Sequence, residues 1–411
     1  MSTRPLLLLV ATGLRAYREY LLRAIAAEYR VHLFHTAEPT WEREHLDGFT
    51  VLPNTWDGPA MVAAALELAE RGPIDGVLSW DEGRIHAASF VAGALGLRNG
   101  DPAVIWRLRD KGQTRAALAG RVRQPRSVPV RTVGQAREAA RRIGYPVILK
   151  PRGYGASVGV VRVTHDDDLA RWYAFTSGTT LPDPVVFDSD HPVLVEECVT
   201  GEEISVDSVV VDGEVTPLYV ARKVVGYPPH AEEIGHYVDA ADPLLTDPAL
   251  TDALRRTHAA LGFRDGWTHT EFMLTDDGPS LIEVNGRLGG DLIPYLGMLA
   301  TGTDPGLAAA AVACGRPPDV TPTRRRVSGV RFFYADEDDT TIGSVHFTGP
   351  PQPQIDLAVA VAQPGAVVSP PPKGSVWSRI AFVTAVGDSV DECRQVLDTA
   401  AAGLRVTVAV P

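Results

Sequence analysis

The chain has 411 residues, enough for two or three domains with a substantial core. Its hydrophobic fraction of 45% and charged fraction of 22% are ordinary for a globular protein, and its net charge of −12 disfavours nucleic acid or an anionic membrane as its main partner. Its cysteines (Cys198, Cys314 and Cys393) lie far apart without CxxC spacing. They indicate neither a disulfide framework nor a zinc site, and they favour a reducing cytoplasm.

Residues 1–100 alternate strands with helices, which predicts a small parallel α/β domain. The apolar run Leu6–Ala11 is too short for the core of a signal peptide, so we expect a buried first strand. No apolar run is long enough to span a bilayer. The turn after that strand carries Gly13 but lacks the G-x-G-x-x-G pattern of a dinucleotide site. The other expected elements are the strands Val31–Phe34 and Gly76–Trp80 and the helices Leu14–Tyr29, Ala60–Glu70 and Arg84–Leu95.

Residues 101–190 centre on a glycine-rich loop, Pro151–Gly159, which we call the glycine flap. Its sequence PRGYGASVG lies between two strands and follows Lys150, so its backbone N–H groups are free to approach a phosphate. It matches neither the P-loop nor the dinucleotide motif. The pattern favours a flap over a nucleotide triphosphate, and an ordinary glycine-rich hairpin is the alternative. Around it we expect helices over Asp101–Gly120 and Gly134–Ile143, a cap at Thr132, strands over Tyr145–Lys150 and Val158–Val163, and a linker over 176–192.

Residues 191–320 are predicted to hold most of a second sheet. Lys223–Tyr237 is dense in glycine, proline and polar residues and reads as a functional loop. From about Val327 the chain turns to strands separated by Pro/Gly turns, with one helix, which predicts a C-terminal α+β subdomain. The expected elements of 191–320 are the strands Val193–Val199, Ile204–Val211 and Val215–Ala221, the helices Thr246–Leu261 and Gly306–Cys314, and a helical stretch to Leu299.

A β-hairpin over Trp267–Asn285 is the most informative stretch of the chain. Its strands flank Asp276-Asp277-Gly278, which we interpret as a three-residue loop with glycine at the position that needs positive φ. With that loop Glu271 faces Glu283, and His269 faces Asn285. A two-residue loop would shift the register and separate the acids. The acids share a face with Met273 and Leu281, and the core face is expected to carry Phe272, Leu274, Ile282 and Val284.

Two carboxylates facing each other across a strand pair repel and need a positive charge between them. No Lys or Arg lies on that face within the hairpin. A divalent cation fits, because two carboxylates and the Asn285 amide oxygen are hard ligands that leave positions open for phosphate, as Mg²⁺ prefers. The alternative is a solvated hairpin face that carries two acids by chance.

The order of these features closely resembles the ATP-grasp superfamily. The nearest branch is that of the carboxylate–amine ligases, which include the bacterial L-amino-acid (dipeptide) ligases. The most specific motifs are HTEF at His269–Phe272, IEVNGRLGGD at Ile282–Asp291 and GYGASVGV at Gly153–Val160, with a weaker match of EIGH at Glu233–His236. The resemblance spans about Asp101 to Ala300. It implies an ATP-grasp fold of the α/β and α+β classes, with an N-terminal α/β domain (1–100), a small subdomain with the flap (101–190), a large subdomain with the metal site (191–320) and a C-terminal subdomain (321–411).

The resemblance also implies roles for individual residues. Arg287 would stabilise the transferring phosphoryl group, while His269, His236 and the turn Gly289–Asp291 would border the amino-acid site. Asp291 stands where some relatives have a large residue, which leaves the size of the acceptor pocket open. Two Mg²⁺ ions, with Mn²⁺ as an alternative, would be held by Glu271, Glu283 and Asn285. ATP would be bound by Lys111, Lys150, Gly153, Gly155, Ser157, Gly159, Glu196, Glu197, Val199, Glu203 and Lys223, with Glu196 at the adenine amino group and Glu203 at the ribose.

The function that follows from the resemblance is an ATP-dependent C–N ligase. It would activate a carboxylate as an acyl phosphate, form an amide or peptide bond with an amine and release ADP and phosphate, with amino acids as the expected substrates. The alternatives are an ATP-grasp carboxylase or purine-pathway enzyme that activates bicarbonate or formate, and a nucleotide-binding regulator without catalysis. We expect a cytoplasmic protein with no nucleic-acid or membrane partner, and we leave a homodimer open.

Overall fold

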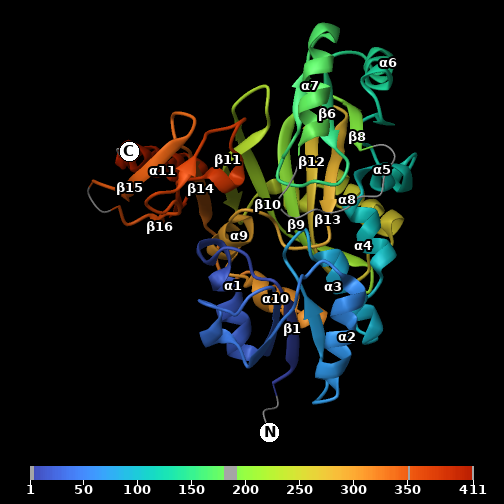
Figure 1. The fold of residues 1–411 in the computed structure, drawn as a ribbon, viewed down its shortest axis with the longest axis vertical. Coiled ribbons are helices and arrows are strands. Elements are labelled where there is room, and N and C mark those ends of the chain that lie inside the picture. Colours follow the sequence, from blue (N-terminus) through green and yellow to red (C-terminus); the bar gives the residue numbers. More distant parts are fainter. Residues whose placement is uncertain (1–3, 180–191, 350–351, 410–411) are drawn as a thin grey trace.

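The computed structural model describes residues 4–179, 192–349 and 352–409 (Figure 1). Its first strand, β1 (Leu6–Val10), is buried along its whole length, as the unbroken apolar run LLLLV predicts for a parallel strand between helices. The predicted parallel α/β domain is confirmed, with sheet order β3-β2-β1-β4 and an edge strand, β3, that we did not predict. Its other elements are α1 (Arg15–Glu28), β2 (Arg30–His35), η1 (Arg43–His45), β3 (Gly48–Val51), α2 (Gly58–Ala69), β4 (Gly76–Leu78) and α3 (Ile85–Ala94).

The prediction of one helix over Asp101–Gly120 is wrong. The chain forms two helices, α4 (Pro102–Arg109) and α5 (Lys111–Leu118), because Asp110 adopts an extended backbone between them. The Asp110 carboxylate accepts hydrogen bonds from two backbone N–H groups of the next turn and thereby caps α5. Lys111 therefore begins a helix instead of lying in the middle of one.

A four-stranded antiparallel sheet carries the glycine flap between β6 and β7. Its order is β5-β8-β6-β7, and its apolar side chains pack against α6 and α7. Thr132 caps α6 as predicted. Of the predicted linker 176–192, residues 180–191 lie outside the described residues. The elements are β5 (Ser127–Val130), α6 (Val133–Ile143), β6 (Val147–Pro151), β7 (Val161–Val163), α7 (Asp166–Gly178) and β8 (Val193–Glu197).

The centre of the molecule is an antiparallel sheet of order β13-β12-β9-β10-β11-β14-β18-β16. One apolar cluster joins it to α9, α10 and the N-terminal sheet, and a second joins it to α4 and α8. The elements up to α10 are β9 (Glu202–Val211), β10 (Glu214–Gly226), β11 (Glu232–Asp239), η2 (Pro243–Thr246), α8 (Pro248–Leu261), β12 (Gly266–Thr275), β13 (Gly278–Asn285), α9 (Ile293–Thr301) and α10 (Pro305–Ala313).

The prediction of a loop over Lys223–Tyr237 is also wrong. The first residues of this stretch form the end of β10, and the last form most of β11. Lys223 pairs with His236 in the antiparallel ladder between the two strands. The prolines that suggested a loop, Pro228 and Pro229, are confined to the turn that joins them. The polar side chains of this stretch are therefore held on paired strands.

The predicted C-terminal α+β subdomain is present, and three of its strands extend the central sheet beyond β11. The division of the chain into four parts stays a prediction, but the third and fourth parts share one sheet. A small sheet of order β17-β15-β19 completes this end. The elements are β14 (Val327–Phe333), β15 (Thr340–Phe347), β16 (Ile355–Ala360), β17 (Val367–Val368), η3 (Val376–Ser378), β18 (Ala381–Gly387), α11 (Val390–Ala402) and β19 (Leu404–Val408).

The hairpin β12–β13 pairs Glu271 with Glu283 and His269 with Asn285, as predicted, although its loop differs from the predicted one. Its loop has two residues rather than three, because Thr275 pairs with Gly278. A bulge restores the register: Glu271 faces Glu283 whereas Phe272 faces Leu281, so Ile282 is an extra residue on β13. The predicted faces of Leu281 and Ile282 are therefore wrong, since Leu281 is buried in the core and Ile282 lines a cavity.

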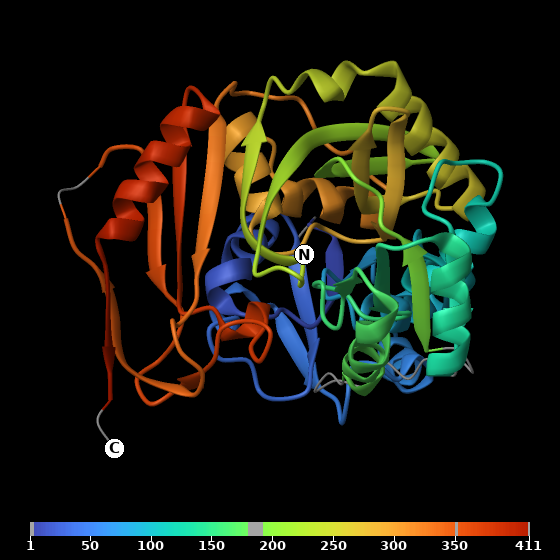
Figure 2. The same ribbon diagram turned by 90° about the horizontal axis from the view of Figure 1, so that it is seen from above.

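The four parts of the chain surround one central region. Seen from above, the N-terminal domain (blue) lies low in the centre, the C-terminal subdomain (orange and red) on the left and the flap-bearing part (cyan to green) on the right, while the yellow-green to gold strands of the central sheet run across the top (Figure 2). No helix in the described ranges is long and apolar enough to cross a membrane.

The contact between α9 and the central sheet depends on a missing side chain at Gly297. A Cβ atom there would lie 2.2 Å from the ring of Tyr219, which is fully buried on β10. We expect Gly297→Ala to destabilise the fold by about 1–3 kcal/mol through overpacking, seen as a lower midpoint of thermal unfolding. Gly134→Ala in α6 is the control, because its Cβ would meet only the Thr132 hydroxyl at 3.8 Å. An unchanged midpoint for Gly297→Ala would show that the helix is free to move away from Tyr219.

Candidate functional site

A cavity of about 390 Å³ lies where the N-terminal domain, the glycine flap, the hairpin β12–β13 and the C-terminal subdomain meet. It brings together most of the residues that the sequence analysis selected. Those that line it are Lys111, Lys150, Gly155, Ser157, Glu203, His269, Glu271, Glu283, Asn285 and Arg287. Those that do not line it are Gly153, Gly159, Glu196, Glu197, Val199, Lys223 and His236.

The facing carboxylates of Glu271 and Glu283 are neutralised by lysines from other elements. The ammonium of Lys223 on β10 lies 3.1 Å from Glu271 and 2.9 Å from both Glu203 and Glu233. Burial alone would lower the pKa of Lys223, but the three carboxylates outweigh it and raise that pKa well above its usual value, so the lysine is charged. Lys111 lies 3.1 Å from Glu283. The hairpin has no Lys or Arg on this face, so the two lysines that neutralise its acids come from neighbouring elements.

Lys150 points from β6 into the cavity and is anchored beneath it by Glu196 of β8, 2.6 Å away. Glu196 also accepts two hydrogen bonds from the Arg115 guanidinium on α5, at 2.8 and 3.1 Å. Burial would raise the pKa of Glu196, but Arg115 and Lys150 outweigh it and bring the pKa down to about 2. Burial and the nearby cations lower the pKa of Lys150 to about 8 despite the pull of Glu196. In this structure the Glu196 carboxylate therefore holds Lys150 in place.

Arg287 meets a partner that the sequence analysis missed. Its Nε donates to the carboxylate of Glu82, which follows β4 and is also bound by Arg109 of α4. Burial would raise the pKa of Glu82, but the two arginines bring it down to about 2. We assign the Asn285 amide so that its nitrogen donates to Glu82 and Glu283, each at 3.2 Å, because the opposite orientation would place its oxygen against these carboxylates. Glu82 could have been found, because ligand sites gather at the carboxyl ends of parallel strands.

His269 is held against Glu271 by a second missed residue, Asp207 of β9. The imidazole Nδ1 lies 2.8 Å from Asp207, and its Nε2 lies 3.4 Å from Glu271. Burial would lower the pKa of His269, but the two carboxylates outweigh it and raise the pKa to about 9. Asp207 also accepts hydrogen bonds from the Trp267 indole at 2.7 Å and the Gly289 N–H at 3.0 Å. Asp207 could have been found from the sequence, because it is the one acid in the mostly apolar segment ISVDSVVV.

The far side of the cavity is organised around Asp291. Its carboxylate pairs with Arg379, which precedes β18, and lies 3.0 Å from Nε2 of His236. His236 also lies 3.3 Å from Glu233. Burial would lower the pKa of His236, but these acids outweigh it and raise the pKa. Glu233, His236 and Asp291 are close enough to share a metal ion, but Lys223 and Arg379 already neutralise the acids.

The residues expected around adenine and ribose lie outside the cavity or at its border. Glu197 pairs with Arg126 at the surface, 3.1 Å away, and Glu203 pairs with Lys223. Gly159 borders a neighbouring cavity of about 370 Å³. The roles assigned to them stay predictions.

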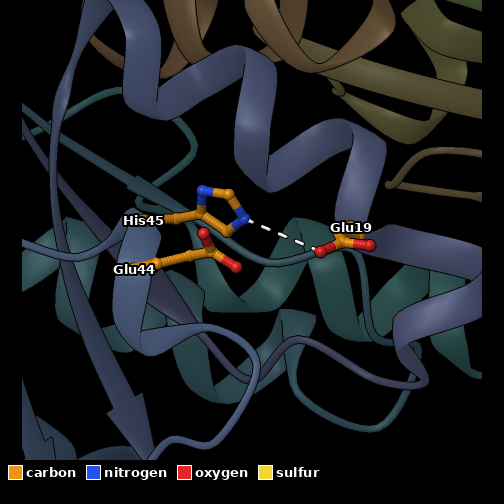
Figure 3. A group of neighbouring side chains, drawn as sticks. All are labelled: Glu19, Glu44 and His45. Carbon is orange, nitrogen blue, oxygen red and sulfur yellow. Dashed lines mark ion pairs between the residues drawn. The ribbon is translucent and has the colours of Figure 1, made fainter.

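A second group of acids and histidine, shown in Figure 3, is Glu19 of α1 with Glu44 and His45 of η1. His45 is 3.9 Å from Glu19, whose carboxylate is already bound by Arg15 at 2.7 and 3.0 Å. None of the three lines the central cavity, so we assign no function to this group.

The donor set of the hairpin suits magnesium. Glu271, Glu283 and Asn285 present only carboxylate and amide groups to the cavity, as a hard cation prefers, with lysines and an arginine close enough to hold phosphate. For the Asn285 oxygen to bind a cation, the amide would turn over and release its present hydrogen bonds.

The chain is similar to known proteins in sequence and in fold. Residues 143–294 match the family model of the ATP-grasp domain. Alanine–anticapsin ligase from Bacillus subtilis is 27% identical over 258 residues, which cover 57% of this chain and 53% of that protein, so the match spans about half of this relative.

Two solved structures extend the likeness to the whole chain. The L-amino acid ligase from Bacillus licheniformis has a TM-score of 0.82 at 19% identity and covers 100% of both chains. The biotin carboxylase domain of Hydrogenobacter thermophilus 2-oxoglutarate carboxylase, in complex with MgADP and bicarbonate, has a TM-score of 0.71 at 16% identity and covers 99% of this chain and 92% of that chain. Residues 143–294 therefore form an ATP-grasp domain, and the whole chain has the fold of the L-amino acid ligase structure.

Proposed function

We propose that the protein is an ATP-dependent carboxylate–amine ligase that joins amino-acid substrates through an amide bond. One observation carries the proposal: Glu271 and Glu283 face each other across β12–β13 and point into a cavity with Lys111, Lys150 and Arg287. This set can hold a nucleotide's phosphates beside a second anion. The similarity to an L-amino acid ligase and to alanine–anticapsin ligase supports amino acids over bicarbonate as the substrates.

The nucleotide's phosphates would lie between the hairpin and the glycine flap. Glu271, Glu283 and Asn285 would hold Mg²⁺, which when bound neutralises the charge that develops on the phosphates. Lys111 and Lys223 now neutralise these acids, and they would turn towards phosphate oxygens once the cation takes their place. Lys150 already points into the cavity from its anchor on Glu196.

The reaction would proceed in two displacements. An oxygen of the donor carboxylate attacks the γ-phosphorus, the bond to ADP breaks, and an acyl phosphate forms. The neutral amine then attacks the acyl carbon, phosphate leaves, and the proton of the amine passes to solvent or a nearby base. Arg287 would leave Glu82 to bind the transferring phosphoryl group, because a guanidinium matches phosphate oxygens in a bidentate geometry. A closed flap would keep water from the acyl phosphate.

The function itself is tested by phosphate release with Mg-ATP and pairs of the twenty amino acids, with amide products identified by mass spectrometry. We expect ADP and phosphate to form only when a donor and an acceptor are both present. ADP formation that depends on bicarbonate alone would point to a carboxylase. Tight ATP binding without turnover on any pair would point to a regulator.

Removing either metal-ligand acid should abolish turnover. We expect Glu271→Gln and Glu283→Gln each to lower phosphate release by about 10²-fold or more in the protein that remains folded. Glu202→Gln is the matched control, because this acid lies on neighbouring β9, exposed and paired with Arg222. Near-normal activity of either variant at the hairpin would remove the metal assignment.

Arg287→Lys keeps the charge but loses the second hydrogen bond to a phosphoryl group. We expect kcat to fall by about 10²-fold or more with little change in ATP affinity, since the contact is made in the transition state. Steady-state kinetics together with nucleotide titration would measure this. Equal losses in kcat and in ATP affinity would instead place Arg287 in ground-state nucleotide binding.

A further inference from the structure

One part of the cavity wall, which we call the apolar end, is formed by large apolar side chains that are mostly exposed. Leu14, in the turn between β1 and α1, leaves 57% of its surface exposed, and Trp377 of η3 leaves 59% exposed. Both line the central cavity, although they come from opposite ends of the chain. Val361 and Val376 line it too. Large apolar side chains left exposed within a cavity are typical of a ligand contact.

Trp377 also borders the neighbouring cavity of about 370 Å³, where it lies with Phe175, His230, Pro371 and Pro372. The two cavities share Ser157 and Val160 of the glycine flap and the segment that follows it. The apolar end therefore has room for a large side chain, and its outer wall is itself mostly apolar and aromatic.

One cation lies at this end without a carboxylate partner. Arg18, one helical turn after Leu14, lines the cavity and donates to the backbone oxygens of Asp291 and Gly289, at 3.2 and 3.4 Å. Its guanidinium also interacts with the neutral Tyr20 hydroxyl. Among the residues that the structure describes, it forms no ion pair. The neighbouring Arg379 is bound by the Asp291 carboxylate, and Arg287 is bound by Glu82. The charge of the Arg18 guanidinium is therefore not neutralised by a carboxylate of the described residues and can pair with an anionic group of a ligand.

We propose that Leu14, Arg18 and Trp377 form the site of the amine substrate, an amino acid with a large apolar or aromatic side chain. Its carboxylate would bind Arg18, and its side chain would lie between Leu14 and Trp377. This assignment rests on the proposed function, because only the amine substrate keeps its carboxylate intact. The carboxylate of the donor must instead reach the phosphate end, beside Arg287 and the acid pair.

Binding measurements test the site without requiring turnover. Calorimetric titration of the full chain, loaded with Mg-ADP, would use L-leucine, L-phenylalanine and glycine as ligands. We expect the two apolar amino acids to bind at least about tenfold more tightly than glycine, since burying a large apolar side chain contributes that much affinity. Trp377→Ala should remove this preference and leave glycine binding unchanged. The control is Trp56→Ala, because Trp56 is 45% exposed and lies outside the cavity.

The carboxylate contact is tested by Arg18→Gln, with Arg18→Lys as the charge-retaining variant. We expect Arg18→Gln to weaken L-leucine about tenfold or more, to leave L-leucinamide unaffected, and to be partly rescued in Arg18→Lys. A purely structural role of Arg18 would weaken both ligands equally and would overturn the assignment. The assignment would also be overturned if leucine and phenylalanine did not bind the parent protein, or if they bound Trp377→Ala as tightly as the parent.

These results are separate from those for the ligase reaction. Binding that follows the expected pattern in a protein without ligase turnover supports the site and counts against the reaction. Turnover in which Trp377→Ala changes KM equally for glycine and phenylalanine supports the reaction and overturns the site. Where turnover occurs, a rise in KM for the donor instead of the acceptor would assign the pocket to the other substrate and overturn the proposal as stated.

Discussion

The structure depends on the charge balance around two carboxylates that face each other across one hairpin. Glu271 and Glu283 are mostly buried, with 16% of each side chain exposed, and two unpaired acids there would repel and lose much of their hydration. Lysines from β10 and α5 remove that cost. Because α5 precedes the flap-bearing sheet and the hairpin belongs to the central sheet, this balance also joins two parts of the chain at the cavity.

The same arrangement recurs around the cavity wall. Arg287 of the central part binds Glu82 of the N-terminal domain, and Asp291 binds Arg379 from the C-terminal subdomain. In each case a charged group has its partner on a different part of the molecule. An anion that enters the cavity must compete with Glu82 and Asp291 for their arginines. Anion binding would therefore weaken ion pairs that now join different parts of the chain.

The sequence predicts the acid pair and several of the side chains that line the cavity, because its motifs combine a strand period with a recognisable turn and place His269, Glu271, Asn285 and Arg287 at fixed spacing. It does not predict how the register arises, since the two-residue loop and the bulge at Ile282 compensate each other and leave the acids opposite. It misassigns Lys223–Tyr237, because glycine, proline and polar residues near a turn also occur on paired strands that line a cleft. It misses Glu82, Asp207 and Arg379, because each acts through a partner far away in the chain, which local patterns do not reveal.

The central sheet runs without interruption from the hairpin β12–β13 to β16 of the C-terminal subdomain. Backbone hydrogen bonds across every strand pair make this sheet a stiff frame, and η3, which carries Trp377, lies directly before its strand β18. The sheet β5-β8-β6-β7, which carries the flap, shares no strand with that frame. We therefore expect the cavity to open and close by rotation of the flap-bearing sheet relative to the rigid central sheet. The central sheet would then set the length of the substrate that fits.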